Sequence, residues 1–254
     1  MKRVAVLNHK GGSGKTTTAV NLGAALAEAG KRVLVLDFDP AAGASLWLGI
    51  ASEDGRPGLA QALAGAAAFP DLVRETAVAG LEIIPAALSL SKAEKSLAGE
   101  IGGEAILKKK VADLPAGRWD YFFVDCPPTL GLLTLNALSA ASHVLIPVEA
   151  HVMALSGVVS LMETVAVVRE RLNPGLSVCG VLACRVDRRT LHSMEVVRIL
   201  KDKFGPLLYS TQIHENVKLA ESPSFAKPVT LYAPSSPGAE DYRALAREFM
   251  EKIS

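Results

Sequence analysis

The segment Lys10-Gly-Gly-Ser-Gly-Lys-Thr-Thr17 is the most informative part of the sequence. It follows the short apolar run at residues 4–7 and precedes a segment with helical spacing at residues 15–29, which Gly30 ends. A strand that runs through a glycine-rich turn into a helix gathers unpaired backbone N–H groups and the positive end of the helix dipole around one point. The stretch therefore predicts a polyphosphate-binding loop.

Each residue type in this loop has a mechanical reason to be there. Gly11, Gly12 and Gly14 leave room for the backbone to wrap phosphate oxygens, and Lys15 places an ammonium on the outer phosphates. The hydroxyl of Thr16 can ligate magnesium, so ATP and Mg²⁺ are the expected cofactors. The predicted ATP-binding residues are Lys10, Gly11, Gly12, Ser13, Gly14, Lys15, Thr16 and Thr17.

Apolar runs rich in β-formers alternate along the chain with stretches of helical spacing, which predicts a parallel sheet covered by helices. We expect an α/β fold of the P-loop NTPase type, a mostly parallel twisted sheet with helices on both faces, in one domain over residues 1–254. Residues 51–79 are dense in Gly, Ala and Pro, and predict a surface excursion with short helices. The expected strands are residues 4–7, 33–36, 81–84, 121–124, 144–148 and 176–183. The expected helices are residues 15–29, 132–140, 155–172, 190–204 and 239–253.

The bulk composition excludes several classes of protein. A formal charge of +1 over 254 residues provides no global field for a polyanion, so any DNA binding must use local patches. Cys126, Cys179 and Cys184 lie far apart in apolar runs, which does not suggest a disulfide framework or a zinc site. The apolar run before the first glycines is too short for a signal peptide or a membrane span. A cytoplasmic protein without a membrane partner is expected.

Three aspartates follow predicted strands, where the ligands of a parallel sheet gather. Asp125 closes the run Tyr121-Phe-Phe-Val124, and Asp37 and Asp39 close the second strand. Phosphoryl transfer to water needs a metal to collect the developing charge and a polar group to orient the attacking water. The three carboxylates are therefore candidates for the magnesium shell and for the water-orienting group.

The loop departs from the usual phosphate-loop pattern, because His9 stands where glycine is expected and Lys10 follows it. With Asp37-Phe-Asp39 after the next strand, it resembles the ParA/MinD group of deviant Walker A ATPases. The resemblance implies an ATP-bound sandwich homodimer in which Lys10 reaches the partner's nucleotide, so Lys10, Lys15 and Asp39 would be catalytic. It also implies that Asp125, Asp37 and Thr16 serve the metal, and it leaves the division of roles between Asp37 and Asp39 open.

The resemblance extends over most of the chain. Residues 125–138, 144–149 and 154–157 look like the middle of ParA/Soj-type chromosome and plasmid partition ATPases, and residues 213–223 resemble a segment that forms part of the nucleotide pocket and carries DNA-facing basic residues. His214 and Glu215 are departures, because partition proteins usually carry proline and arginine there, and residues 41–44 lack the usual Gln-Gly-Asn-rich stretch. The resemblance is to the short form of the family, so no DNA-reading domain is expected before the first strand.

That short form implies a function. Its ATP-bound dimer binds double-stranded DNA without sequence preference, and a ParB-like or other adaptor protein stimulates hydrolysis and releases it, so a nucleoid-associated Mg-dependent ATPase is expected. Residues 185–203 contain six basic residues against three acidic ones, a modest local patch. The preferred phosphate contacts are Arg188, Arg189 and Lys218.

Two alternatives remain at this stage. A MinD-like membrane-associated ATPase needs a basic amphipathic C-terminal helix, but residues 240–252 carry four acidic residues against three basic ones. An iron–sulfur or metal-delivery ATPase needs paired cysteines, whereas Cys179 and Cys184 are expected on opposite faces of a buried strand. Both alternatives are therefore less well supported than the partition ATPase.

Overall fold

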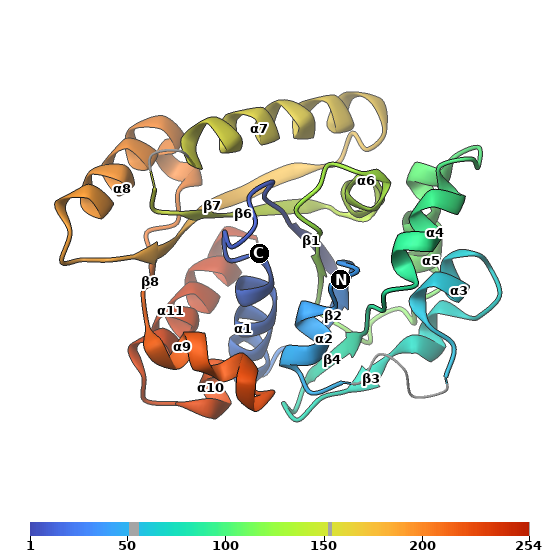
Figure 1. Cartoon of the computed structure of the whole chain (residues 1–254), viewed down its shortest axis with the longest axis horizontal. Coiled ribbons are helices and arrows are strands. Elements are labelled where there is room, and N and C mark those ends of the chain that lie inside the picture. Colours follow the sequence, from blue (N-terminus) through green and yellow to red (C-terminus); the bar gives the residue numbers. More distant parts are fainter. Residues whose placement is uncertain (51–55, 152–153, 254) are drawn as a thin grey trace.

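A computed structural model of the chain describes residues 1–50, 56–151 and 154–253 (Figure 1). Its centre is an eight-stranded sheet in the order β3-β4-β2-β5-β1-β6-β7-β8, in which only the β3–β4 pairing is antiparallel. The strands are β1 (Lys2–Val6), β2 (Val33–Asp37), β3 (Arg74–Glu75), β4 (Leu81–Ile84), β5 (Tyr121–Asp125), β6 (His143–Glu149), β7 (Ser177–Val186) and β8 (Ile213–His214).

Helices cover both faces of the sheet, so the predicted fold class is confirmed (Figure 1). One face packs against α3 (Leu59–Leu63), α4 (Leu90–Leu97), α5 (Ile106–Ala112), α6 (Leu132–Ala140), α7 (Ala154–Arg171) and α8 (Leu191–Phe204). The other face packs against α1 (Lys15–Glu28), α2 (Gly43–Trp47), α9 (Val217–Glu221), α10 (Val229–Tyr232) and α11 (Pro237–Lys252). Short 3₁₀ turns lie at Phe69–Leu72, Gly103–Ala105, Gly205–Leu207 and Ser222–Phe225.

The order of the strands brings the predicted site residues together. β1 lies between β5 and β6, and β5 lies between β1 and β2. In the parallel register Val6 is the partner of Asp125, and Asp37 is also a partner of Asp125. The phosphate loop after β1 and the two strand-end aspartates therefore meet at the carboxyl edge of the sheet, where parallel α/β proteins bind their ligands.

The stretch at residues 51–79 is not the surface excursion that its composition predicts. Leu59, Leu63, Phe69 and Leu72 are buried in the same apolar layer as α4 and α5. The short helices are present, as α3 and a 3₁₀ turn, but their apolar residues cover one end of the sheet. Part of this predicted stretch, residues 51–55, lies outside the described residues.

The two cysteines of β7 lie on the same face of the sheet, which corrects the prediction of opposite faces. Val144 pairs with Val178 and Leu145 pairs with Gly180, so Cys179 is an extra residue in the ladder. A bulge shifts the alternation of side chains by one position. Cys179 and Cys184 therefore both pack into the layer that contains α1 and α11.

The C-terminal helix α11 is part of the core. Tyr242, Leu245, Phe249 and the following Ile253 are buried against β5 and α1. Its acidic side chains hold the loop around β8: the carboxylate of Glu248 accepts hydrogen bonds from the backbone N–H groups of Ser210 and Thr211, 2.7 and 2.8 Å away. In the described part of the chain, no helix is long and apolar enough to cross a membrane.

Candidate nucleotide-binding site and nucleic-acid interface

The phosphate loop has the backbone geometry that a ring of N–H donors needs. Gly12 and Gly14 adopt φ angles of 76° and 95°, a region that side-chain-bearing residues rarely enter. Gly14 caps the N-terminus of α1, and a Cβ atom at this position would lie 3.3 Å from Sγ of Cys184. Glycine is therefore required at Gly14 both by its backbone conformation and by the close approach of β7.

Lys15 is a buried cation with few partners. Its side chain begins α1 and is 7% exposed, and its Nζ donates one long hydrogen bond, 3.3 Å, to the backbone carbonyl of Lys10. Burial lowers the pKa of Lys15, while the nearby carboxylates of Asp125 and Asp39 oppose this shift. A buried ammonium of this kind gains most from an anionic ligand, which supplies both charge and acceptors. The loop thus fits a polyphosphate.

Asp125 is a buried carboxylate that lacks hydrogen-bond donors in the described structure. Its carboxylate is fully buried, and within the described residues neither oxygen has a hydrogen-bond partner. Burial raises the pKa of Asp125 well above its usual value and the Asp37 carboxylate adds to the shift, whereas Thr16 and Lys15 act in the opposite direction. Unpaired buried oxygens beside a threonine hydroxyl suit a hard divalent cation. The residues present therefore fit a magnesium ion, held by Thr16 and Asp125.

Asp37 is fully occupied by protein donors. Its Oδ2 accepts hydrogen bonds from the backbone N–H and the hydroxyl of Ser45, at 2.8 and 2.7 Å, and its Oδ1 accepts from the N–H of Asp39 at 3.3 Å. Burial raises the pKa of Asp37 to about 6, against these hydrogen bonds. Asp37 therefore anchors α2 and the loop that carries Asp39. It can support the magnesium site only indirectly, by fixing this loop.

Asp39 lies in the loop between β2 and α2 and is half-buried. Its Oδ1 accepts a hydrogen bond from the N–H of Ala41 at 2.9 Å, and its charge is felt by Lys15. This position faces the phosphate loop with one carboxylate oxygen uncommitted within the described part of the chain. Such a group can orient a water molecule near the outer phosphate.

Lys10 forms an ion pair within its own chain. Its Nζ lies 2.6 Å from Oε2 of Glu149 at the end of β6, and the second oxygen of Glu149 lies 3.2 Å from Nη1 of Arg185. Lys10 is the main cause that lowers the pKa of Glu149. The side chain of Lys10 is 45% exposed, so this pair can open at little cost.

A cavity of about 300 Å³ adjoins the loop and extends the phosphate site. Gly12, Gly14 and Thr17 line one side of it, and the segment around β8 and α9 lines the other. Sequence reasoning missed most of its walls; the resemblance of residues 213–223 to a nucleotide-pocket segment was the only signal, and this location agrees with it. The remaining lining residues are Trp47, Cys184, Arg185, Ile213, His214, Glu215, Asn216, Leu219, Ala220, Pro223 and Tyr242.

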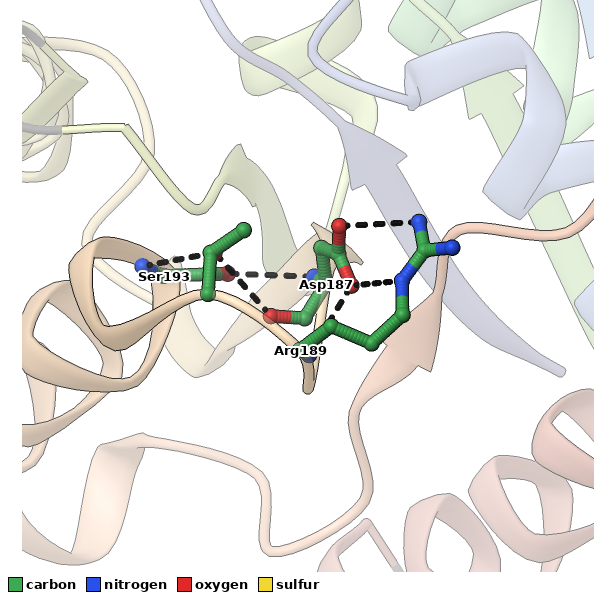
Figure 2. A network of polar contacts seen from close by, with 4 residues as sticks. Asp187, Arg189 and Ser193 are labelled. Atoms are coloured by element: carbon green, nitrogen blue, oxygen red, sulfur yellow. Dashed lines mark hydrogen bonds and ion pairs between the residues drawn. The ribbon is translucent and has the colours of Figure 1, made fainter.

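The three predicted DNA contacts are exposed, but each has a partner within the chain. Figure 2 shows Arg189 against Asp187: the Nε and Nη2 groups donate to the two carboxylate oxygens at 2.9 and 3.0 Å. Lys218 pairs with Glu221 at 2.9 Å. Arg188 instead donates from Nε to the ring nitrogen Nε2 of His214 at 2.7 Å.

Figure 2 also shows how the loop that carries these arginines is held. Ser193 accepts a hydrogen bond from the backbone N–H of Asp187, and Thr190 caps α8 by accepting from the N–H of Ser193. Arg188 and Arg189 thus stand on an ordered turn at the N-terminus of α8, at the edge of a groove of about 800 Å³. Arg188 and Arg189 are therefore adjacent, and Lys218 lies on α9, whose residues Val217 and Ala220 line the same groove.

No group of three or more His, Cys, Asp or Glu side chains in residues 1–50, 56–151 and 154–253 has the arrangement of a metal site. Cys184 is buried and Cys179 is half-buried, and desolvation raises the pKa of each thiol to about 12. Thiols of this kind are poor ligands for an iron–sulfur cluster, which binds thiolates.

Comparison with known proteins places the chain in a family. Residues 1–178 match the AAA domain family. The sporulation initiation inhibitor protein Soj of Bacillus subtilis is 44% identical over 97% of both chains, and the chromosome partitioning protein ParA of Caulobacter vibrioides is 40% identical over 99% of this chain and 95% of its own. A solved structure of cobyrinic acid a,c-diamide synthase from Mycobacterium smegmatis, with bound ADP and magnesium, superposes with a TM-score of 0.84 at 34% identity, covering 97% of this chain and 93% of that one. With this extent of identity around a complete phosphate loop, the chain belongs to the ParA/Soj family of chromosome-partitioning P-loop ATPases.

Proposed function

We propose that this chain is a Mg-dependent ATPase that positions DNA or a DNA-borne cargo. ATP closes two chains into a sandwich dimer, the dimer binds double-stranded DNA without sequence preference, and hydrolysis releases it. The observation that carries the proposal lies at the loop: within the described residues, the buried ammonium of Lys15 has one long hydrogen bond to a carbonyl, and the buried carboxylate of Asp125 accepts no hydrogen bond. Mg-ATP supplies what both lack.

The roles of the residues follow from their places. The amides of Gly11 to Thr17 and the Lys15 ammonium bind the phosphates, while Thr16 and Asp125 hold the ion, which neutralises charge on the phosphate oxygens when bound. Asp39 orients the water, because it has an uncommitted oxygen, whereas those of Asp37 are engaged with Ser45 and Asp39. Asp37 supports both functions by fixing the loop.

Lys10 acts in the dimer. In the single chain it is paired with Glu149, and its exposed position leaves it free to exchange that carboxylate for a phosphate of the partner's nucleotide. Nucleotide binding and dimerisation are then linked, because the ligand stabilises the state in which it has more contacts. Chemistry at such a site serves as a switch between bound and released states.

DNA is bound through local basic residues, since the net charge of +1 gives no general attraction. Arg188, Arg189 and Lys218 are the proposed contacts, and dimerisation doubles their number. A ParB-like or other adaptor stimulates hydrolysis and so sets the time that the dimer stays on the nucleoid. The name of the Caulobacter vibrioides relative, a chromosome partitioning protein, supports a role in partition.

The MinD-like alternative is less well supported by the structure. The apolar residues of α11 are buried and Glu248 and Asp241 are used to hold β8, so this helix has no free apolar face for lipid. The similarity to cobyrinic acid a,c-diamide synthase is lower in identity than that to Soj and ParA. Partition therefore remains the better proposal.

Retention of duplex DNA of unrelated sequence, compared with ATP, with ADP and without nucleotide, tests the proposal directly. We expect retention with ATP alone, and a steep loss as salt is raised. Equal retention in all three conditions would contradict a nucleotide switch. Binding to anionic vesicles in place of DNA would favour the MinD-like alternative.

A further inference from the structure

Of the three residues predicted to contact DNA, Arg188 alone has no carboxylate partner in the described structure. It donates a hydrogen bond to the ring of His214 instead. Arg189 and Lys218 face Asp187 and Glu221, which compensate their charges. His214 accepts from the inner nitrogen of Arg188, Nε, through its own Nε2. The two terminal nitrogens of Arg188 have no partner within residues 1–50, 56–151 and 154–253.

The proton positions on His214 follow from its partners. Because Arg188 can only donate, Nε2 of His214 must be the unprotonated, accepting nitrogen. The other ring nitrogen, Nδ1, lies 2.9 Å from Oδ2 of Asp241 and therefore carries the proton that it donates. The same carboxylate oxygen accepts from the backbone N–H of His214 at 2.9 Å. Asp241 thus fixes both the tautomer and the orientation of the ring.

The surroundings explain why Arg188 needs a neutral partner. The groove beside it is lined by four carboxylates, those of Asp187, Glu215, Glu240 and Asp241. A mobile guanidinium at this place would pair with one of them, and its charge would be lost to an approaching phosphate. The hydrogen bond from Nε to the His214 ring fixes the orientation of the planar guanidinium, and therefore of Nη1 and Nη2. Because the His214 ring is uncharged, the positive charge of Arg188 is not compensated by this contact.

Burial supports a positioning role. The side chains of His214 and Asp241 are 16% and 17% exposed, so the pair is held between β8 and the start of α11. Arg188 is exposed at the surface end of this chain of hydrogen bonds. Because the ordered pair of His214 and Asp241 holds Arg188 in place, Arg188 loses less conformational entropy when it binds an anion.

We propose that His214, oriented by Asp241, is a positioning residue that presents the terminal guanidinium nitrogens of Arg188 to a DNA backbone phosphate. The inference rests on the proposed DNA-binding function and adds a specific device to it. Arg188 then makes a bidentate phosphate contact, whereas Arg189 must first exchange Asp187 for the phosphate.

The test uses the full chain with ATP and a fluorescent duplex of unrelated sequence, and measures the DNA affinity at several salt concentrations. The slope of log affinity against log salt reports the number of phosphate contacts, at about 0.9 for each contact in one chain. Arg188→Ala is expected to reduce the slope by about 0.9 for each chain of the bound dimer. His214→Asn, whose amide reaches the place of Nδ1 but not that of Nε2, is expected to reduce it by the same amount.

Matched variants separate positioning from folding. His214→Gln places an amide oxygen near the position of Nε2 and is expected to restore most of the slope. Asp241→Ala, which removes the acceptor of both His214 N–H groups, should behave like His214→Asn. The double variant Arg188→Ala/His214→Asn should lose no more than Arg188→Ala alone, because both changes remove the same contact.

A second readout needs no DNA. In the free protein, the Nε–H resonance of Arg188 should be protected from exchange and shifted by its hydrogen bond, and both features should be lost in His214→Asn and kept in His214→Gln. The inference would be overturned, and the proposed function kept, by either of two results: a salt slope in His214→Asn equal to that of the parent, or a reduction of the slope in the double variant equal to the sum of the two single reductions. Absence of ATP-dependent DNA retention by the parent chain would overturn the proposed function, and the inference with it.

Discussion

Asp37 and Asp125 are register partners at the ends of β2 and β5, yet only Asp37 has hydrogen-bond donors. Ser45 holds the carboxylate of Asp37 in place, whereas both oxygens of Asp125 are buried without a partner within the described residues. Two adjacent carboxylates of the same sheet edge thus have different tasks. Asp37 holds the loop through Ser45, and Asp125 is the proposed magnesium ligand.

Replacing Asp125 by asparagine should stabilise the protein in the absence of nucleotide and magnesium. The isosteric amide removes a buried charge that lacks a partner, which costs about 1–3 kcal/mol or more. Because the pKa of Asp125 is raised in the folded state, the folded parent binds more protons than the unfolded chain above the usual carboxyl pKa. The free energy of unfolding of the parent therefore falls as pH rises through that interval, and the advantage of the variant grows with pH.

Urea unfolding of both proteins between pH 5 and pH 8 measures this difference, with roughly equal stabilities expected at the acid end. Magnesium-dependent ATP hydrolysis by Asp125→Asn should fall at the same time. A variant that is less stable than the parent at pH 8 would show that Asp125 has a partner in solution.

Lys15→Ala should abolish ATP binding, because it removes the only buried ammonium in the described phosphate loop. Titration calorimetry with Mg-ATP checks this, and an unchanged ATP affinity would refute the assignment of the phosphate loop as the ATP-binding site. Lys10→Ala is the matched control: its side chain points to Glu149, so a single chain should keep ATP while hydrolysis in the dimer is lost.

Asp39→Ala should slow ATP hydrolysis and leave an ATP-bound dimer. Asp39 contributes one hydrogen bond to its loop, from the N–H of Ala41, while Asp37 holds the loop through its two hydrogen bonds to Ser45. Size-exclusion chromatography with ATP and a phosphate-release assay follow the two properties. Turnover at the parental rate would move the water-orienting role to another residue.

ATP should change the fluorescence of Trp47. This side chain is buried beside the cavity that also contains Gly12 and Gly14, and its Nε1 donates a hydrogen bond to the carbonyl of Lys227 at 3.0 Å. A nucleotide base in the cavity would touch the indole ring and alter its emission. Trp119→Phe should keep the response and Trp47→Phe should remove it; the reverse result would place the base elsewhere.

Reversal of Arg188 and Arg189 to glutamate should remove retention on DNA with little effect on ATP affinity, since neither residue lines the cavity. The control reverses Lys108 and Lys109 on α5, which changes the net charge equally at a distant helix. Retention by the arginine variant at the same salt concentration would exclude this patch. Loss of retention in both variants would point to overall charge as the cause.

The sequence was sufficient for the strong patterns. The strand that ends at Asp125 is a continuous apolar run, and the helix after Gly14 has clear apolar spacing and a glycine after its end; the structure confirms both. The phosphate loop was predictable because its function dictates residue types at fixed spacing. Asp37 and Asp125 could be placed at one edge of the sheet from the parallel order alone.

Other features depend on tertiary structure. β3 and β8 contain two residues each, which is too short for a period to be visible. Cys179 is the extra residue of a bulge, and no local pattern marks it. The cavity that holds Trp47 and Tyr242 joins segments separated by almost 200 residues, and the partners of Arg188 and Lys10 come from other elements as well. Such contacts become visible only once the chain is folded.

The attachment of β8 to α11 by carboxylate side chains makes the end of the chain a component of its ligand site. Glu248 and Asp241 secure the amides from Ser210 to His214, and this segment continues into a wall of the cavity beside the phosphate loop. Truncation before Asp241 would therefore remove the hydrogen bonds that hold this segment, and would loosen the cavity wall that faces the phosphate loop. The last helix therefore completes the core and also supports the cavity wall, so its loss would lower stability and ligand affinity together.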